Sequence, residues 1–217
     1  MKTDSDLKQD VIAELGWEPS VNAAQIGVEV KGGIVTLAGH VDSYTEKLHA
    51  ERAAQRVSGV KGLAVEMDVK LPGLSKRTDA DIVGTAVNVL QWTTSLPANS
   101  VKVKSENGWI TLSGELEWDY QRQAAKDAVR YLIGVTGVSD EITIKPKASS
   151  SAVKSEIEAA LKRRAQNDAK HISVEVNSDN VTLSGTVHSW SERELAAGTA
   201  WASPGVRKVV DNIKIAH

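Results

Sequence analysis

The chain contains no cysteine and no phenylalanine among its 217 residues, and its only aromatic residues are six tryptophans and three tyrosines. Without cysteine there is no disulfide framework, no thiolate nucleophile or metal ligand, and no lipid-anchored N-terminal cysteine. Without phenylalanine the cores must be built from Val, Ile, Leu and Ala. The chain is 41% hydrophobic and 25% charged, with a net charge of −2, which is typical of a folded protein.

Long hydrophobic runs are also missing. No run approaches the roughly 20 apolar residues that a membrane-spanning helix requires. The first 14 residues include four acidic ones, and their longest apolar run is Val11-Ile12-Ala13, too short for the apolar region of a secretory signal. If Met1 is the natural start, these features predict a cytoplasmic protein. The alternative location is the periplasm, if a signal has been trimmed.

One segment occurs three times without a gap, at 6–69, 81–144 and 152–215. Its clearest anchor is Val35-Thr36-Leu37-Ala38-Gly39, which returns as Ile110-Thr111-Leu112-Ser113-Gly114 and as Val181-Thr182-Leu183-Ser184-Gly185. A Gly-Val pair follows each anchor at the same distance, at 59–60, 134–135 and 205–206. An ungapped match over the whole unit predicts three copies of one fold.

The first half of a copy is typical of a helix followed by a hairpin. Asp6 is predicted to cap a helix whose apolar residues repeat with helical spacing. Two runs with alternating apolar residues, one from Ile26 and one from Val35, flank Gly32-Gly33, which predicts a β-hairpin. The helix residues are Leu7, Val11, Ile12 and Leu15.

The second half predicts another helix and a third strand. The helix spans about 45–58 and places small residues such as Ala50 and Ala53 on one face, so that it can lie close to a sheet. Gly59 ends it, and an alternating strand follows. A helical crossover makes the second and third strands parallel, beside an antiparallel hairpin.

The fold class that follows is α+β, with three tandem α-β-β-α-β domains, each a three-stranded mixed sheet with two helices on one face. Short polar linkers separate the domains. The predicted boundaries are 1–70, 81–145 and 152–217 for the domains, with linkers at 71–80 and 146–151.

The repeated pattern resembles the BON domain of bacterial osmotically inducible and nodulation-associated proteins. The resemblance rests on the Val-Thr-Leu-Ser-Gly stretch followed by Gly-Val, and it covers all three units. It implies a non-enzymatic, transport-associated module linked to envelope or osmotic stress, with phospholipid binding as its activity. The chain departs from the usual family layout because it shows no secretion signal and no lipoprotein cysteine, and has three copies where two are frequent.

The residues themselves predict neither an enzyme nor a cofactor. No pair among the five histidines has the spacing of zinc ligands on one helix, and no nucleophile elbow or phosphate loop occurs. We therefore expect no catalytic residue, no metal site and no cofactor. Nucleic acid is not expected as a partner either, because basic and aromatic residues do not interleave on one sheet face.

Two groups of residues are candidates for binding. Aromatic residues recur in the loop before the second helix of each unit, where they either pack on a neighbouring helix or domain or contact a lipid headgroup or partner. The only basic cluster lies near the end of the first helix of the third unit, where it either caps that helix or attracts anionic headgroups. The candidates are Tyr44, Trp118, Tyr120, Trp190, Lys162, Arg163, Arg164 and Lys170.

Three other tryptophans have structural interpretations. Trp17 and Trp92 stand just past the first helix of their units, and we expect each ring to be half-buried over the end of a core. Trp201 replaces Gln55 and Arg130 on the second helix of the third unit, and we expect it to point outward into a contact between domains.

These observations predict a binding protein that engages an anionic phospholipid membrane, or a membrane-associated partner, through tandem domains. The alternatives are an ion or osmolyte sensor, for example for a monovalent cation, and a protein scaffold. A homo-oligomer remains open, because small sheets have exposed edges that can pair.

Overall fold

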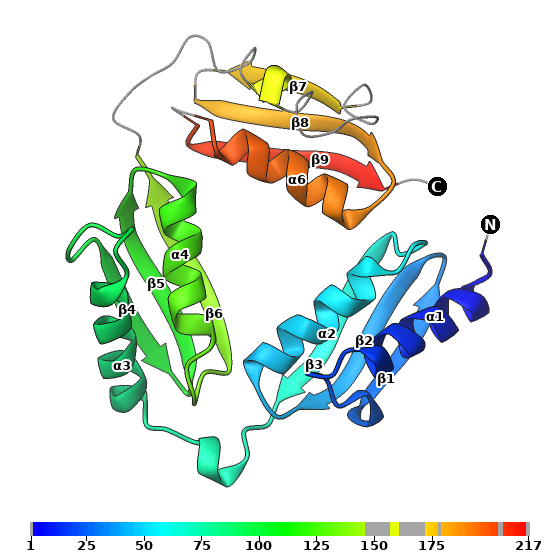
Figure 1. Cartoon of the computed structure of the whole chain (residues 1–217), viewed down its shortest axis with the longest axis horizontal. Helices are drawn as coiled ribbons and strands as arrows, with labels where there is room; N and C mark the ends of the chain where they lie inside the picture. The colour runs from blue at the N-terminus through cyan, green and yellow to red at the C-terminus, as the bar shows by residue number, and fades with distance from the viewer. Residues whose placement is uncertain (1, 146–156, 161–171, 178, 204–205, 216–217) are drawn as a thin grey trace.

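In the computed structural model, residues 2–145, 157–160, 172–177, 179–203 and 206–215 are described. Their backbone forms three sheets of three strands each, one in each repeated unit (Figure 1). The strands are β1 (Ile26–Lys31), β2 (Ile34–Val41) and β3 (Gly62–Val69); β4 (Val101–Glu106), β5 (Trp109–Leu116) and β6 (Gly137–Ile144); and β7 (Ile172–Asn177), β8 (Asn180–Val187) and β9 (Lys208–Ile215).

Each sheet is mixed, as the sequence predicts. The second strand lies in the middle, antiparallel to the first and parallel to the third. The hairpin partners in the first unit include Val28 with Leu37, and the parallel partners include Leu37 with Val65. The α+β fold class with three repeated units is confirmed.

The helices cover one face of each sheet. They are α1 (Asp4–Trp17) and α2 (Tyr44–Arg56) in the first unit, α3 (Asp79–Trp92) and α4 (Asp119–Arg130) in the second, and α6 (Trp190–Trp201) in the third. Residues 157–160 are helical, and the rest of the expected first helix of the third unit lies outside the described residues. Short 3-10 turns lie at Ala23–Gln25 and Gly73–Ser75.

The three cores are separate and aliphatic. Each buries the alternate residues of its central strand under the small residues of its second helix, such as Leu37 under Ala50 and Ala53 in the first unit. Leu112 and Leu183 hold the same place in the other two units. Burial of such apolar side chains supplies the main driving force for each fold.

The start of the first helix differs from the prediction, because Asp6 is not its N-cap. Thr3 is the N-cap, and its hydroxyl accepts a hydrogen bond from the Asp6 amide at 3.2 Å. The Asp6 carboxylate in turn accepts from the Thr3 amide, so that Asp6 is the third residue of a capping box. Thr78 and Asp81 repeat the arrangement in the second unit.

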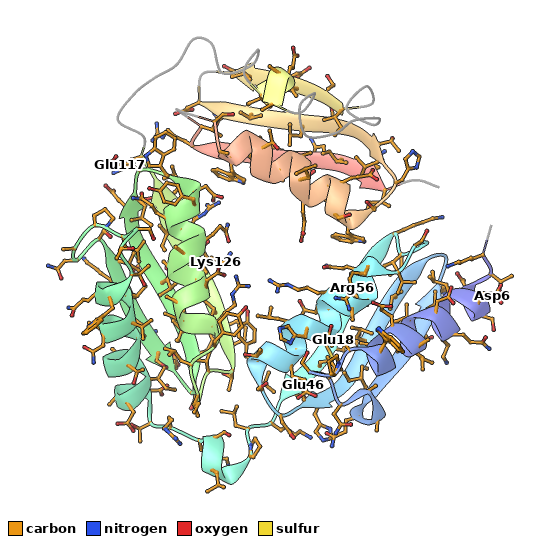
Figure 2. All side chains as sticks on the ribbon, in the orientation of Figure 1. Asp6, Glu18, Glu46, Arg56, Glu117 and Lys126 are labelled. Carbon is orange, nitrogen blue, oxygen red and sulfur yellow. The ribbon has the colours of Figure 1, made fainter. Side chains whose placement is uncertain are left out.

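The two helices of the first unit are held together at one end by ion pairs. Arg56, at the end of α2, lies 3.0 Å from an oxygen of Glu14 in α1 and 3.1 Å from an oxygen of Glu18, the C-cap residue of that helix (Figure 2). Asp4, at the start of α1, accepts hydrogen bonds from the Gly32 and Gly33 amides of the hairpin turn. These contacts tie both ends of α1 to the rest of the unit.

The glycine that ends the repeated anchor has a steric role. Gly39 has a φ of +128°, and a Cβ atom built there would lie 2.2 Å from the Gln25 carbonyl oxygen. Gly114 shows the same conflict, at 2.1 Å from the Ser100 oxygen, and Gly185 has a similar φ of +133°. Only glycine fits this crossing of the first two strands.

Gly39→Ala is therefore expected to destabilise the first unit by about 3 kcal/mol, because the methyl group would collide with backbone at an unfavourable φ. Hydrogen exchange of the β1 and β2 amides measures the effect. Gly27→Ala is the matched control, since a Cβ there would lie an ordinary 3.6 Å from the Ala38 oxygen. Equal protection in the two variants would contradict this steric role.

Candidate functional site

The predicted basic cluster cannot be placed. Lys162, Arg163, Arg164 and Lys170 lie outside the described residues. Their attraction to anionic headgroups stays a prediction. The candidate aromatic residues, by contrast, all lie in described segments.

The loop aromatic of the first unit contacts the second unit. Tyr44 is the first residue of α2, and its half-buried ring packs against the hydrophobic core of the second unit. The Tyr44 hydroxyl interacts with the backbone of Val138 in β6, and the positive charge of Arg130, at the end of α4, is close enough to act on it. We call this contact the first junction.

The second unit meets the third in a similar way. Trp118 precedes α4 and Tyr120 lies in its first turn, and both line a cavity whose opposite wall includes Trp201 at the end of α6. The guanidinium carbon of Arg122, on α4, lies 4.3 Å from the centre of the Trp201 ring. Trp201 also packs against the cores of both units, which confirms its predicted place between domains. This is the second junction.

The third unit meets the first across 130 positions in sequence. Trp190, the first residue of α6, donates a hydrogen bond from Nε1 to the Val60 carbonyl at 3.3 Å. The two units also enclose a cavity of about 380 Å³, in which Trp190 and Glu194 face Arg52 and Arg56. This is the third junction.

All three junctions follow one rule, in which the start of a second helix lies against the end of another unit's second helix or the segment after it. The contacts run from the first unit to the second, from the second to the third, and from the third back to the first. Figure 1 shows the result as a triangle in which α2, α4 and α6 face the centre and α1 and α3 lie outside. For Tyr44 and Trp190 this supports packing on a neighbouring domain, and lipid contact by them stays a prediction.

Tyr120 differs from the other loop aromatics. Its side chain remains 60% exposed, although it lines the cavity of the second junction. It is therefore available to a ligand.

Burial at the first junction alters the chemistry of two side chains. Burial raises the pKa of Tyr44 above its ordinary value, and the charge of Glu51 adds to the rise, while the Val138 hydrogen bond and Arg130 oppose it. Burial also raises the pKa of Glu51, against the charges of Lys47 and Arg52. The neutral form of Tyr44 is thus the form that this junction favours.

Trp17 and Trp92 contradict the expectation that they cover the ends of the cores. Both rings are almost entirely in solvent, at 84% and 85% exposed. The helices continue through these residues, and at about 100° per residue each tryptophan points about 200° away from the buried leucine two positions earlier. The helical period could have indicated this, because Leu15 and Leu90 already define the buried faces.

A second exposed apolar site lies in the first linker. The side chain of Leu74 is 94% exposed within the short 3-10 turn, and Lys76 and Arg77 follow directly. Arg77 donates to the carbonyls of Leu74 and Lys76, which holds the turn in shape.

Sequence reasoning missed one recurrent polar side chain. Glu46 on α2 is buried, and its carboxylate accepts from the Asn22 and Asp42 amides, both at 2.8 Å (Figure 2). Gln121 and Glu192 occupy the same position and accept from backbone amides of the preceding loop. These residues hold the loops that carry the junction aromatics. Aligning the three copies would have revealed the shared Glu, Gln and Glu.

No group of three or more carboxylate or imidazole side chains within the described segments is arranged to hold a metal ion. No helix among the described residues is long and apolar enough to cross a bilayer.

Trp190→Ala is expected to open the third junction, because it removes both the hydrogen bond to Val60 and the ring that lies between the two units. Small-angle X-ray scattering should show a larger radius of gyration with unchanged helix content by circular dichroism. Trp17→Ala removes an equally large ring from an exposed position, so its scattering should match the parent protein. Unchanged scattering from Trp190→Ala would show that the junction does not hold the units together.

The first junction is expected to weaken in alkali. Because the folded pKa of Tyr44 lies above its ordinary value of about 10, its contribution is present below pH 10 and is lost as the pH rises through the raised pKa. Melting temperatures between pH 8 and pH 11 should therefore fall less steeply in Tyr44→Phe than in the parent protein. Parallel curves for the two proteins would show that ionisation of Tyr44 does not weaken the first junction.

Comparison with known proteins relates this architecture to one family. Osmotically-inducible protein Y of Escherichia coli K12 is 29% identical over 178 residues, which cover 78% of this chain and 88% of the relative. Two structures of CdsD, a structural protein of the type III secretion system of Chlamydia trachomatis, are 15% identical with a TM-score of 0.26, too low to support a conclusion. They cover 97% and 100% of this chain and 92% and 100% of their own. The BON domain model matches residues 3–70, 78–146 and 149–217, and the chain therefore belongs to the BON domain family in three tandem copies.

Proposed function

We propose that the chain is a stress-associated, non-enzymatic binding protein that attaches to anionic phospholipid membranes. The observation that carries the proposal is the pair of exposed tryptophans, Trp17 and Trp92, at the same place on the first helices of two units. Tryptophan favours the boundary between lipid and water, because its ring is apolar and its N–H still finds a polar partner. An exposed apolar residue, Ile12 or Val87, accompanies each ring on its helix.

The first linker adds to this attachment. Leu74 offers an exposed apolar side chain, and the neighbouring Lys76 and Arg77 offer positive charge. Each basic residue close to an anionic surface contributes about 1 kcal/mol, which salt weakens. Several weak contacts in one chain raise the overall affinity, because the first contact brings the others close to the surface.

The link to osmotic stress rests on the relative. The similar Escherichia coli protein is named as osmotically inducible. We extend that association to this chain, with the same BON domains as the shared feature. A membrane-associated protein partner would use the same exposed rings.

Trp17→Ala/Trp92→Ala is expected to weaken binding to vesicles of anionic lipid about tenfold or more, because two rings no longer enter the interface. Co-sedimentation at low and high salt, with neutral vesicles in parallel, measures the change. Tyr131→Ala is the matched control, since this aromatic side chain is also exposed but lies at the end of α4.

Other variants locate the contact surface. If Arg163→Glu/Arg164→Glu abolishes binding while the tryptophan variant binds normally, the contact belongs to the basic cluster of the third unit instead. Absence of binding to any vesicle would rule the membrane proposal out.

A further inference from the structure

The cavity of the second junction has the size of a small-molecule site. It measures about 400 Å³ and lies between α4 and the end of α6, so that two units supply its walls. Its aromatic walls are Trp118 and Tyr120 from one unit and Trp201 from the other. Cavities of this volume accommodate ligands of several non-hydrogen atoms.

The charged side chains in the walls have one sign. Asp119 and Asp127 line the cavity, and its described lining includes no lysine or arginine. Asp119 pairs with Arg122 and Asp127 with Arg130, so these carboxylates are held in place on α4. At the third junction the charged residues that line the corresponding cavity are Arg52, Arg56 and Glu194. The two cavities therefore differ in the charged side chains of their walls.

The Trp201 ring is already in contact with a cation of the protein itself. Arg122 lies over its ring at 4.3 Å and is itself within 3.7 Å of an Asp140 oxygen. The electron-rich face of an indole attracts cations by about 0.5–2 kcal/mol, more when water is excluded. The aromatic groups of the cavity thus offer the surfaces that cations prefer.

A glycine keeps the cavity open. Gly198 lies within α6, and a Cβ atom built there would have no neighbour within 4 Å. The same position holds Arg52 in the first unit and Asp127 in the second. Glycine inside a helix costs about 1 kcal/mol relative to alanine, and no close contact at Gly198 requires it. A longer side chain at this position would fill the cavity.

We propose that this cavity binds the quaternary ammonium group of a small molecule such as choline or a betaine. Trp118, Tyr120 and the face of Trp201 that Arg122 does not cover provide cation–π contacts, and the carboxylates of Asp119 and Asp127, each paired with an arginine of α4, lie in the wall without having to coordinate the ligand. A quaternary ammonium group has no N–H donor, so it loses little when rings replace water around it. This binding goes beyond the proposed membrane attachment and uses different residues.

The ligand would also join two units. Because it touches the start of α4 and the end of α6 together, binding stabilises the second junction as well as the folded units. The expected consequence is a melting temperature that rises with ligand concentration.

The test titrates the full chain with choline chloride while tryptophan fluorescence and melting temperature are followed, against sodium chloride at the same ionic strength. We expect a saturable fluorescence change and a rise in melting temperature with choline alone. The neutral analogue 3,3-dimethyl-1-butanol has the same shape without the charge, and should bind at least about tenfold more weakly because the cation–π attraction is lost. Equal binding of the two compounds, or no saturable response to choline, would overturn the proposal.

Gly198→Leu is the decisive variant, because its Cβ atom would have no neighbour within 4 Å and the rest of the side chain would extend from the wall of the cavity. It should remove the response to choline and keep the helix content. Gly84→Leu is the matched control, since Gly84 lies in α3 with equally open space around it, and should respond as the parent protein does. A normal response from Gly198→Leu would also overturn the proposal.

A quaternary ammonium group occurs both in free osmolytes and in a lipid headgroup. Vesicles of phosphatidylcholine distinguish these two sources. Retention of the parent protein but not Gly198→Leu on such vesicles would assign the headgroup, whereas a response to free choline without retention assigns the small molecule. The Trp17→Ala/Trp92→Ala variant leaves this cavity unchanged, because neither residue lines it. The failure of one proposal can therefore be distinguished from the failure of the other.

Discussion

The arrangement of the whole molecule depends on one kind of contact, in which the start of a second helix docks against another unit. Each unit is too small to bury all its apolar surface alone. Tyr44 and Trp190 lie at the same helical position and each reaches a different neighbour, and Trp118 and Tyr120 lie beside that position in the second unit. Because the third contact returns to the first unit, the series closes. The buried Glu46, Gln121 and Glu192 matter for the same reason, since they fix the loops from which these rings project.

Much of each unit could be predicted from the sequence, because the determinants are local and occur three times. The hairpin, the parallel third strand and the alanine-rich helix all follow from periodicity and turn residues. The start of the first helix differs from the prediction for an equally local reason. Thr3 and Asp6 both favour a helix start, but Thr3 is the N-cap and Asp6 is the third residue of their capping box. Trp17 and Trp92 are exposed and not half-buried as predicted, because Leu15 and Leu90 already define the buried face of each helix.

The junctions could not be predicted, since they join surfaces whose sequences differ from one unit to the next. Gln55, Arg130 and Trp201 share one position, yet only the last is a large aromatic. Copies that fold alike have thus acquired different chemistry where they meet. One junction holds a half-buried tyrosine close to a glutamate, one has aromatic and acidic walls, and one has two arginines and a glutamate. Such divergence suits a protein whose repeats share a scaffold while each interface acquires its own role.

The hydrogen bond between Trp190 and Val60 has a consequence for how the molecule is made. Contacts within a unit join residues close in sequence, so each unit can fold as soon as it leaves the ribosome. The third junction must wait until nearly the entire chain has been synthesised, because its partners are 130 positions apart. Ring closure therefore has to follow the synthesis of the third unit. Until then the end of α2 is uncovered, and a nascent chain stalled before the third unit would expose a docking surface that the finished protein keeps for itself.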